Sequence, residues 1–361
     1  MGEETRLARC EGADVAFFSF SDPGARPPGF AAPGTPGKLR AVPQDRRRTE
    51  PPPQGGAGEP TDSVDSFLRE AAAISEAGEA LPTGRLAPGE MLGERFRIER
   101  LAGTGGMGAV YRAEDLATGG RAAIKVMGVQ SASGGERFLR EGVVLAELSH
   151  PCVVRYIAHG LTPVGSPFLA MDWLEGEDLF ERLGRSGLDA GESLAIARRV
   201  CEGLAVAHAR GIVHRDIKPS NLFLVGGDPA ATKIIDFGVA RVEAGATMLT
   251  RPGTSLGTVG YMAPEQAMEA TDVDARADFF ALGCVLYECL TGRPAFAGRP
   301  AAVLVKVLRD HPQKPSEVRA GLEASVDELV ARLLAKDREA RPRDAAEVLR
   351  ALDSLGVARV E

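Results

Sequence analysis

The chain has 361 residues, of which 44% are hydrophobic and 26% charged, and its formal net charge is −7. This is the composition of a globular protein with one large or two ordinary domains, and the acidic balance argues against nucleic-acid partners bound through a basic face. Five cysteines without a C-x-x-C pair, no long apolar run and no signal pattern argue against a disulfide framework, a zinc site and a membrane span, and favour a cytoplasmic location.

Glycine and proline dominate the start of the chain, because residues 1–60 contain 9 Gly and 10 Pro. Such a segment buries too little apolar surface to offset the entropy of ordering, so we predict that it is disordered. Residues 61–91 form a predicted linker. Within it, "TDSVDSFLREAAAISEAGEA" places apolar residues on one helical face, which predicts a short helix, either packed on the folded domain or transient.

From about residue 92 the sequence changes to short strands separated by turn residues, in "FRIERLAG", "GAVYRAED", "RAAIKVMG" and "PFLAMDWL". Between the last two strands, "GERFLREGVVLAELSH" has helical spacing. We predict a strand-rich lobe over about 92–173 and a larger helix-rich lobe over about 174–355. The predicted helices of the second lobe are residues 189–209, 274–292, 300–309, 325–335 and 343–355.

The first strands carry a glycine pattern, G-x-G-x-x-G, at Gly103, Gly105 and Gly108. Glycines let a backbone approach a ligand closely, but they also make ordinary turns, so the pattern alone is weak. Because a strand follows where a dinucleotide-binding fingerprint would open a helix, the pattern favours a glycine hairpin folded over phosphates. Lys125 lies in the apolar run "AAIKV", where its ammonium needs an anionic partner. Glu141, on the next predicted helix, is the candidate.

The stretch "GIVHRDIKPSNLFL", residues 211–224, places charged groups between two apolar runs. A core strand would not leave these charges unpaired, and a surface loop would not need the apolar flanks. The pattern therefore predicts a loop that is pinned to the core at both ends and presents fixed side chains to a site.

Five motifs occur in order along residues 92–355: "GTGGMG", "AAIK", "HRDIKPSN", "DFG" and "APE". In this order and approximate spacing they resemble the eukaryotic-type (Hanks-type) protein kinases, above all the bacterial serine/threonine branch. The resemblance implies an α+β, two-lobed protein kinase fold, with a small β-rich lobe carrying one main helix and a larger α-helical lobe. It also implies ATP-dependent transfer of the γ-phosphate to Ser or Thr hydroxyls of protein substrates in signal transduction.

The resemblance implies a role for each polar residue near the phosphates. Asp216 accepts the hydrogen bond of the substrate hydroxyl and later its proton, and Lys218 offsets charge on the γ-phosphate. Lys125, oriented by Glu141, holds the α- and β-phosphates. Thr258 hydrogen-bonds Asp216 and Lys218, which suits a serine or threonine acceptor.

The metal ligands implied by the resemblance are Asn221 and Asp236, which would bind Mg²⁺ or Mn²⁺ through hard oxygen atoms. Two further residues are implied to brace the site. His214 is expected to tie the catalytic loop to the "DFG" segment, and Asp278 to accept backbone N–H groups of that loop.

A nucleotide pocket is also implied, with Val110 and Ala123 as its roof, Met171 at its back and Leu222 as its floor. Such pockets are mostly apolar. The residues that we expect around the nucleotide are Leu101, Ala102, Gly103, Thr104, Gly105, Gly106, Met107, Gly108, Val110, Ala123, Lys125, Met171, Leu222 and, through their backbone groups, Asp172 and Leu174.

Between "DFG" and "APE" lies a segment with several hydroxyl side chains. We expect autophosphorylation there, through transient self-association, with Arg215 as the cation that could pair with the added phosphate. Glu265 of "APE" is expected to form a buried ion pair with Arg341. The candidate phosphosites are Thr247, Thr250, Thr254 and Ser255.

Two other functions remain open. A pseudokinase, acting as a scaffold or binding module, would be favoured by loss of Lys125, Asp216 or Asp236, and all three are present. The second is a small-molecule kinase on a related fold. The segment that runs from "DFG" to "APE", called the "APE" segment below, and Lys218 both favour protein substrates instead.

Overall fold

The computed structural model describes residues 85–105, 108–127, 148–237, 258–268, 270 and 272–357. The segment predicted to be disordered, 1–60, lies outside these residues. So do most of the predicted linker, 61–91, and the main helix expected in the small lobe.

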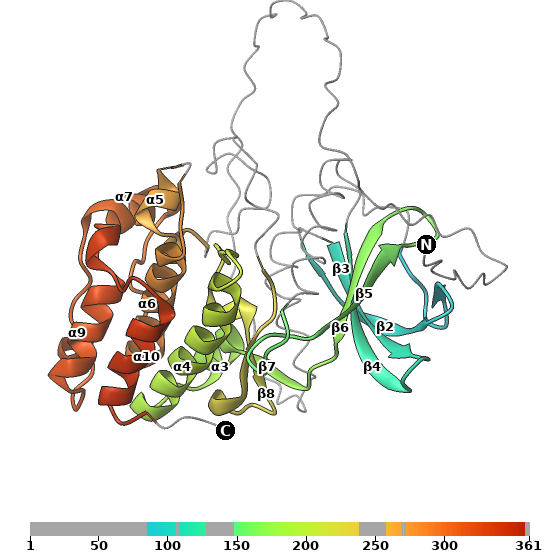
Figure 1. Cartoon of the computed structure of the whole chain (residues 1–361), viewed down its shortest axis with the longest axis horizontal. Helices are drawn as coiled ribbons and strands as arrows, with labels where there is room; N and C mark the ends of the chain where they lie inside the picture. Colours follow the sequence, from blue (N-terminus) through green and yellow to red (C-terminus); the bar gives the residue numbers. More distant parts are fainter. Residues whose placement is uncertain are drawn as a thin grey trace, which may run out of the picture. The chain divides into compact units, whose positions relative to one another are not determined.

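The first part of the described chain is a six-stranded antiparallel sheet with the order β1-β2-β3-β4-β6-β5. Figure 1 shows it on the right, apart from the helices of the second part. The strands are β1 (Met91–Leu92), β2 (Phe96–Gly105), β3 (Gly108–Asp115), β4 (Gly120–Met127), β5 (Tyr156–Leu161) and β6 (Pro167–Asp172).

Alternating side chains hold this sheet together. In β3, Tyr111 and Ala113 are buried and are paired in register with Ile124 and Ala122 of β4, which are also buried. Because successive side chains of a strand point to opposite faces, the intervening residues are left on the other face. One of these, Val110, faces the site described below.

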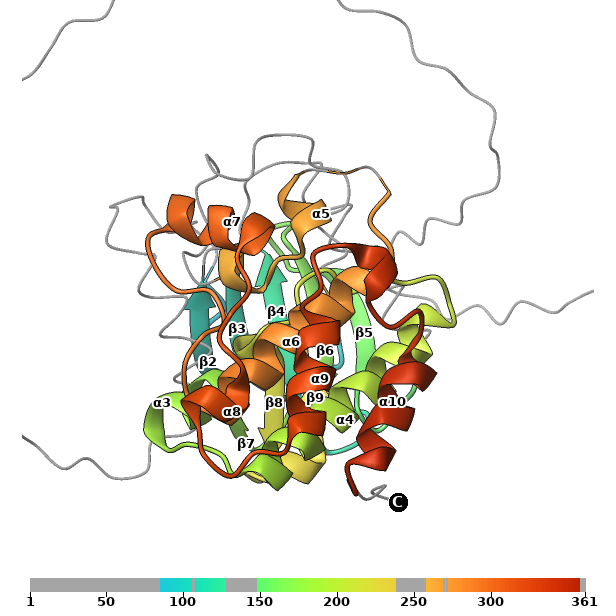
Figure 2. The same cartoon turned by 90° about the vertical axis from the view of Figure 1, so that its left-hand side faces the viewer.

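The second part is helical and is built around α6 (Figure 2). The side chains of α6 are buried along nearly its whole length. The longest helix, α4, starts at a capping box in which Asp189 and Glu192 each accept the other's backbone N–H. The helices are α3 (Leu179–Arg185), α4 (Ala190–His208), α5 (Pro264–Ala267), α6 (Arg276–Thr291), α7 (Pro300–Arg309), α8 (Pro315–Val318), α9 (Ala324–Leu333) and α10 (Ala345–Ser354).

A small antiparallel sheet positions the central loops. Its strands are β7 (Gly176–Asp178), β8 (Leu222–Val225) and β9 (Thr232–Ile234), in that order. The catalytic loop expected from the sequence runs into β8, and the "DFG" segment follows β9, so the pairing of these two strands brings the two segments together.

The predicted fold class is confirmed: a β-rich lobe precedes a larger helical lobe. The four predicted strands and five predicted helices are present, with ends that differ by at most two residues. Several short elements were not predicted, because short segments have weak periodicity: β1, β5, α3, α5, α8 and the small sheet. No helix among the described residues is long and apolar enough to cross a membrane.

Candidate active site

The loop before β8 is held in an unusual backbone conformation. Arg215 has φ 66°, the one positive φ outside glycine in the described part of the chain, and such a conformation costs about 1–3 kcal/mol. Asp278 of α6 stabilises it, because its carboxylate accepts the backbone N–H of His214 at 2.8 Å and that of Arg215 at 2.7 Å. The expected role of Asp278 is confirmed.

The predicted catalytic residues Asp216 and Lys218 and the predicted metal ligand Asn221 lie together in this loop. The Asn221 amide nitrogen donates to the Asp216 carbonyl at 2.8 Å and to its carboxylate at 3.2 Å. The Lys218 ammonium is 3.7 Å from the same carboxylate. The carboxyl group of Asp216 is thereby oriented by one amide and faced by one cation.

The two predicted metal ligands, Asn221 and Asp236, are brought together by β8 and β9. Leu222 pairs with Ile234, and the Ile235 backbone N–H donates to the Asn221 carbonyl at 3.1 Å. Since the Asn221 amide nitrogen faces Asp216, its Oδ1 points away from that carbonyl. An amide oxygen and a carboxylate are the donors that a hard cation such as Mg²⁺ prefers, so these two residues fit the ion.

This pair alone does not complete a coordination shell. Within the described ranges, no group of three or more His, Cys, Asp and Glu side chains could hold a metal ion. A cation bound at Asp236 and Asn221 would need further oxygen atoms, and Mg²⁺ commonly takes them from nucleotide phosphates and water.

His214 braces the loop from inside. Its side chain is completely buried and its ring lies 4.6 Å from that of Phe237 in the "DFG" segment. Its Nδ1 accepts the Asp216 backbone N–H at 3.2 Å. Burial lowers the pKa of His214, which favours the neutral ring. The expected structural role, linking the loop to the "DFG" segment, is confirmed.

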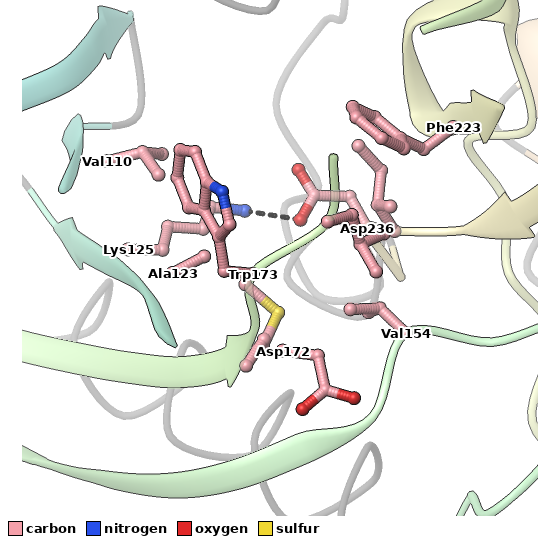
Figure 3. Close-up of a pocket in the computed structure, with 11 residues that line it drawn as sticks. Val110, Ala123, Lys125, Val154, Asp172, Trp173, Phe223 and Asp236 are labelled. Atoms are coloured by element: carbon pink, nitrogen blue, oxygen red, sulfur yellow. Dashed lines mark hydrogen bonds and ion pairs between the residues drawn. The ribbon is translucent and has the colours of Figure 1, made fainter. Parts of the chain in front are cut away.

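Lys125 and Asp236 face each other across the site. The Lys125 ammonium, on β4, is 2.9 Å from the Asp236 carboxylate, and Figure 3 shows the contact as a dashed line. Lys125 is only 8% exposed, as its apolar sequence context predicts. Its expected partner Glu141 lies outside the described residues, so that pairing stays a prediction.

Lys125 and Asp236 both line a mostly apolar cavity, the character typical of small-molecule sites. Val110 and Phe223 lie on opposite sides of it in Figure 3, and the Asp172 carboxylate points away from the ion pair. The lining residues are Val110, Ala123, Lys125, Val154, Met171, Asp172, Trp173, Leu174, Phe223, Ile235 and Asp236.

The expected floor residue is corrected by this arrangement. Leu222 is fully buried in the helical lobe and does not line the cavity, whereas its neighbour Phe223 does. The two residues are adjacent in β8, so their side chains point to opposite faces. Four lining residues were not predicted: Val154, Trp173, Phe223 and Ile235. Residues 222–225 are all apolar, so no alternation of polarity indicated which face of this strand meets the cavity.

The glycine hairpin is present, since Gly105 pairs with Gly108 at the ends of β2 and β3. Gly108 has φ 141°, which few other residues adopt. Of the residues predicted there, Leu101 is 37% exposed, Ala102 is buried, and Gly103 and Thr104 pair with β3. Val110, in β3, lines the cavity. Gly106 and Met107 lie outside the described residues.

Beside the cavity, the Asp172 backbone N–H donates to the Arg155 carbonyl at 2.9 Å. Because this N–H already has an acceptor, we expect the Asp172 carbonyl, rather than its N–H, to bond the adenine of a nucleotide. Trp173 follows, with the guanidinium groups of Arg100 and Arg112 within 5.7 and 5.8 Å of its ring. These cations lie over an aromatic face and help to fix the indole at the cavity wall.

The end of the "APE" segment is fixed to the helical lobe. Arg341 donates to both carboxylate oxygens of Glu265, at 2.7 and 2.9 Å, and its side chain is fully buried. It also donates to the Ala335 carbonyl at 2.7 Å and lies over the Phe280 ring. The predicted buried ion pair is confirmed.

Several predicted residues cannot be placed. The side chain of Thr258 and the candidate phosphosites lie outside the described residues, and their roles remain predictions. The candidate phosphosites are Thr247, Thr250, Thr254 and Ser255.

Comparison with known proteins agrees with this geometry. The family model described as "Protein kinase domain" matches residues 96–351. Serine/threonine-protein kinase PknB of Mycobacterium leprae is 35% identical over 265 residues, and Pkn1 of Myxococcus xanthus is 39% identical over 253. A probable serine/threonine-protein kinase of Streptomyces coelicolor is 37% identical over 268 residues. The matches cover 71%, 68% and 71% of this chain but 42%, 36% and 39% of those relatives.

Proposed function

Because the chain belongs to the protein kinase domain family, we propose that it is an ATP-dependent serine/threonine protein kinase. The observation that carries the proposal is the Lys125–Asp236 contact of 2.9 Å at the wall of an apolar cavity. We assign Lys125 to the phosphates and Asp236 to a metal ion. The loop that holds Asp216 is joined to the "DFG" segment through Asn221, which bonds Asp216 and accepts the Ile235 backbone N–H.

Transfer of a phosphoryl group depends mainly on positioning and on neutralising charge. We assign Asp216 to orient the substrate hydroxyl and to accept its proton late in the reaction. Lys218, whose ammonium lies 3.7 Å from Asp216, offsets negative charge at the transferred group. Lys125 holds the α- and β-phosphates of the nucleotide.

The nucleotide would occupy the cavity beneath Val110 and Ala123, with its base against Phe223 and near the backbone of Asp172 and Leu174. Asp236 and Asn221 would hold Mg²⁺. When bound, this ion neutralises charge on the phosphates.

Protein substrates are supported by the anchored end of the "APE" segment. The Glu265–Arg341 pair fixes that segment beside the catalytic loop, where it can form part of a surface for a polypeptide. A serine or threonine acceptor is supported by Lys218 and by the names of the relatives, which are serine/threonine-protein kinases.

The activity is tested by incubating the full chain with labelled ATP, Mg²⁺ and a generic basic protein, beside Asp216→Asn. We expect Asp216→Asn to lower the rate by about 10²–10⁴-fold, because it removes a positioned proton acceptor. Nucleotide binding can be followed separately, since Trp173 is the single tryptophan of the chain and lines the cavity. Binding without transfer by the wild-type protein would instead indicate a pseudokinase.

We further propose autophosphorylation at Thr250 or Thr254, through transient self-association. Intact-mass measurement after incubation with ATP and Mg²⁺ should show added phosphate, and peptide mapping should locate it within residues 245–256. A rate per molecule that rises with protein concentration would indicate reaction between two copies. Full activity without added phosphate would contradict the regulatory role.

A cytoplasmic, reducing location is part of the same proposal. It is supported by the four described cysteines, which are buried and unpaired. They are Cys152, Cys201, Cys284 and Cys289.

A further inference from the structure

The peptide group between Arg215 and Asp216 is held at both of its polar atoms. Its N–H, which belongs to Asp216, donates to His214 Nδ1 at 3.2 Å, and its carbonyl, which belongs to Arg215, accepts from Gln266 Nε2 at 3.0 Å. The orientation of this peptide sets the direction in which the Asp216 side chain leaves the backbone. A hydrogen bond to this peptide group therefore helps to orient the catalytic carboxylate.

Gln266 lies in a different part of the chain, in the short helix α5, directly after Glu265 of "APE". Its Oε1 accepts the Ala263 backbone N–H at 3.1 Å, so the amide is used at both ends. Gln266 is only 9% exposed, so water cannot easily replace either bond. The preceding residue, Glu265, is fixed by Arg341. The donor that Gln266 offers to Arg215 is consequently fixed to the helical lobe.

The peptide needs such support because of its conformation. Arg215 has a positive φ, which a non-glycine residue adopts only where its surroundings impose it. Asp278 holds the N–H on the N-terminal side of Arg215, and Gln266 holds the carbonyl on its C-terminal side. Without Gln266, the carbonyl side could rotate toward a more favourable conformation and carry Asp216 with it.

We propose that Gln266 is a positioning residue of the kinase reaction, which orients Asp216 by holding the Arg215 carbonyl and so couples the end of the "APE" segment to the catalytic loop. The proposal rests on the proposed kinase function. Gln266 itself need not touch either substrate. Its loss should lower turnover while leaving ATP binding almost unchanged, because the nucleotide cavity is lined by other residues.

The test uses Gln266→Glu and Gln266→Asn in the full chain. Gln266→Glu keeps an oxygen for Ala263 but removes the N–H donor to Arg215, and Gln266→Asn keeps the amide but shortens its reach. The matched control is Gln313→Glu, which makes the same charge change at an exposed glutamine. Turnover, the KM for ATP, the ATP affinity from Trp173 fluorescence and hydrogen exchange of residues 211–221 are measured for each protein.

We expect both Gln266 variants to lose at least fivefold in kcat, equivalent to about 1 kcal/mol, with less than a twofold change in ATP affinity. Residues 211–221 should exchange faster in them than in Gln313→Glu. A smaller loss in kcat, or a parallel loss of ATP affinity, overturns the proposal. If neither variant folds, Gln266 supports the fold in general and the proposal is wrong. An inactive wild-type protein contradicts the proposed function instead, and the hydrogen-exchange comparison then still decides whether Gln266 holds the loop.

Discussion

Each lobe contains an arginine–carboxylate pair with two hydrogen bonds, and the two pairs have the same donor–acceptor distances. In the small lobe Arg95 donates to Asp115 at 2.7 and 2.9 Å, and in the helical lobe Arg341 donates to Glu265 at 2.7 and 2.9 Å. Their surroundings differ. The Arg95 side chain is 39% exposed, whereas that of Arg341 is fully buried; the carboxylates are both shielded, with Asp115 4% and Glu265 9% exposed.

Since the distances are equal, we expect burial of the arginine to set what each ion pair contributes to stability. Water and salt reach Arg95 and screen its charge, and screened pairs contribute little. In the interior, removing one partner leaves the other charge without water or a counterion. The buried pair also lies next to Gln266, so its effect can extend to the catalytic loop.

The largest effect should come from Arg341→Ala. Breaking a buried pair by removing one partner costs about 3–5 kcal/mol of stability, because Glu265 would remain charged and buried. We expect a lower free energy of unfolding in urea, and reduced kinase activity even at temperatures where the variant is folded.

The matched control for this variant is Arg343→Ala. Arg343 is two residues away, but its side chain is 81% exposed and lies 3.9 Å from Glu347. Its removal should change the free energy of unfolding by less than about 1 kcal/mol. Equal losses for Arg341→Ala and Arg343→Ala would contradict the role of burial.

Much of the site could be predicted because its residues lie close together in the sequence. Asp216, Lys218 and Asn221 share one short loop, so their spacing nearly fixes their proximity. The pairing of Glu265 with Arg341 joins residues 76 positions apart. It was predicted through the family resemblance and not from the spacing of the residues.

Other features depend on tertiary contacts that the sequence does not display. The positive φ of Arg215 arises from bonds to Asp278 and Gln266, which come from two separate helices. That Phe223 rather than Leu222 lines the cavity has a simpler cause. Both are apolar, and only the register of β8 against β9 decides which one faces the cavity.

Leu222→Ala and Phe223→Ala together test which of the two side chains contributes to ATP binding. Leu222 is fully buried in the helical lobe, so its truncation should cost about 2–5 kcal/mol of stability and leave the ATP affinity of the folded protein unchanged. Phe223→Ala should weaken ATP binding by about fivefold, since it removes about 1 kcal/mol of apolar contact at the cavity. Trp173 fluorescence measures the affinity. Weaker binding in Leu222→Ala alone would restore Leu222 as the floor.

Lys125→Arg tests the ion pair that joins the two lobes. The substitution keeps a positive charge near Asp236 but replaces a compact ammonium by a longer, planar group. We expect kcat to fall at least about tenfold, equivalent to about 1.4 kcal/mol, while the free energy of unfolding changes by less than about 1 kcal/mol. Retained turnover would mean that a positive charge is sufficient there and that its position is not critical.

The smallest effect should come from Arg95→Ala. The hydrogen bonds from Arg95, with smaller contributions from Ala117 and Thr118, lower the pKa of Asp115 from 3.8 to about 2. Exposure of Arg95 screens the pair, and we expect a loss below about 1 kcal/mol at pH 7 with unchanged activity. Because the folded-state pKa is lowered, this contribution is present above about pH 4 and is lost as the pH falls through 2. The difference in unfolding free energy between wild type and Arg95→Ala should therefore shrink between pH 5 and pH 2, and also with added salt. A difference as large as that of Arg341→Ala, unaffected by salt, would show that the two pairs are equivalent despite their unequal burial.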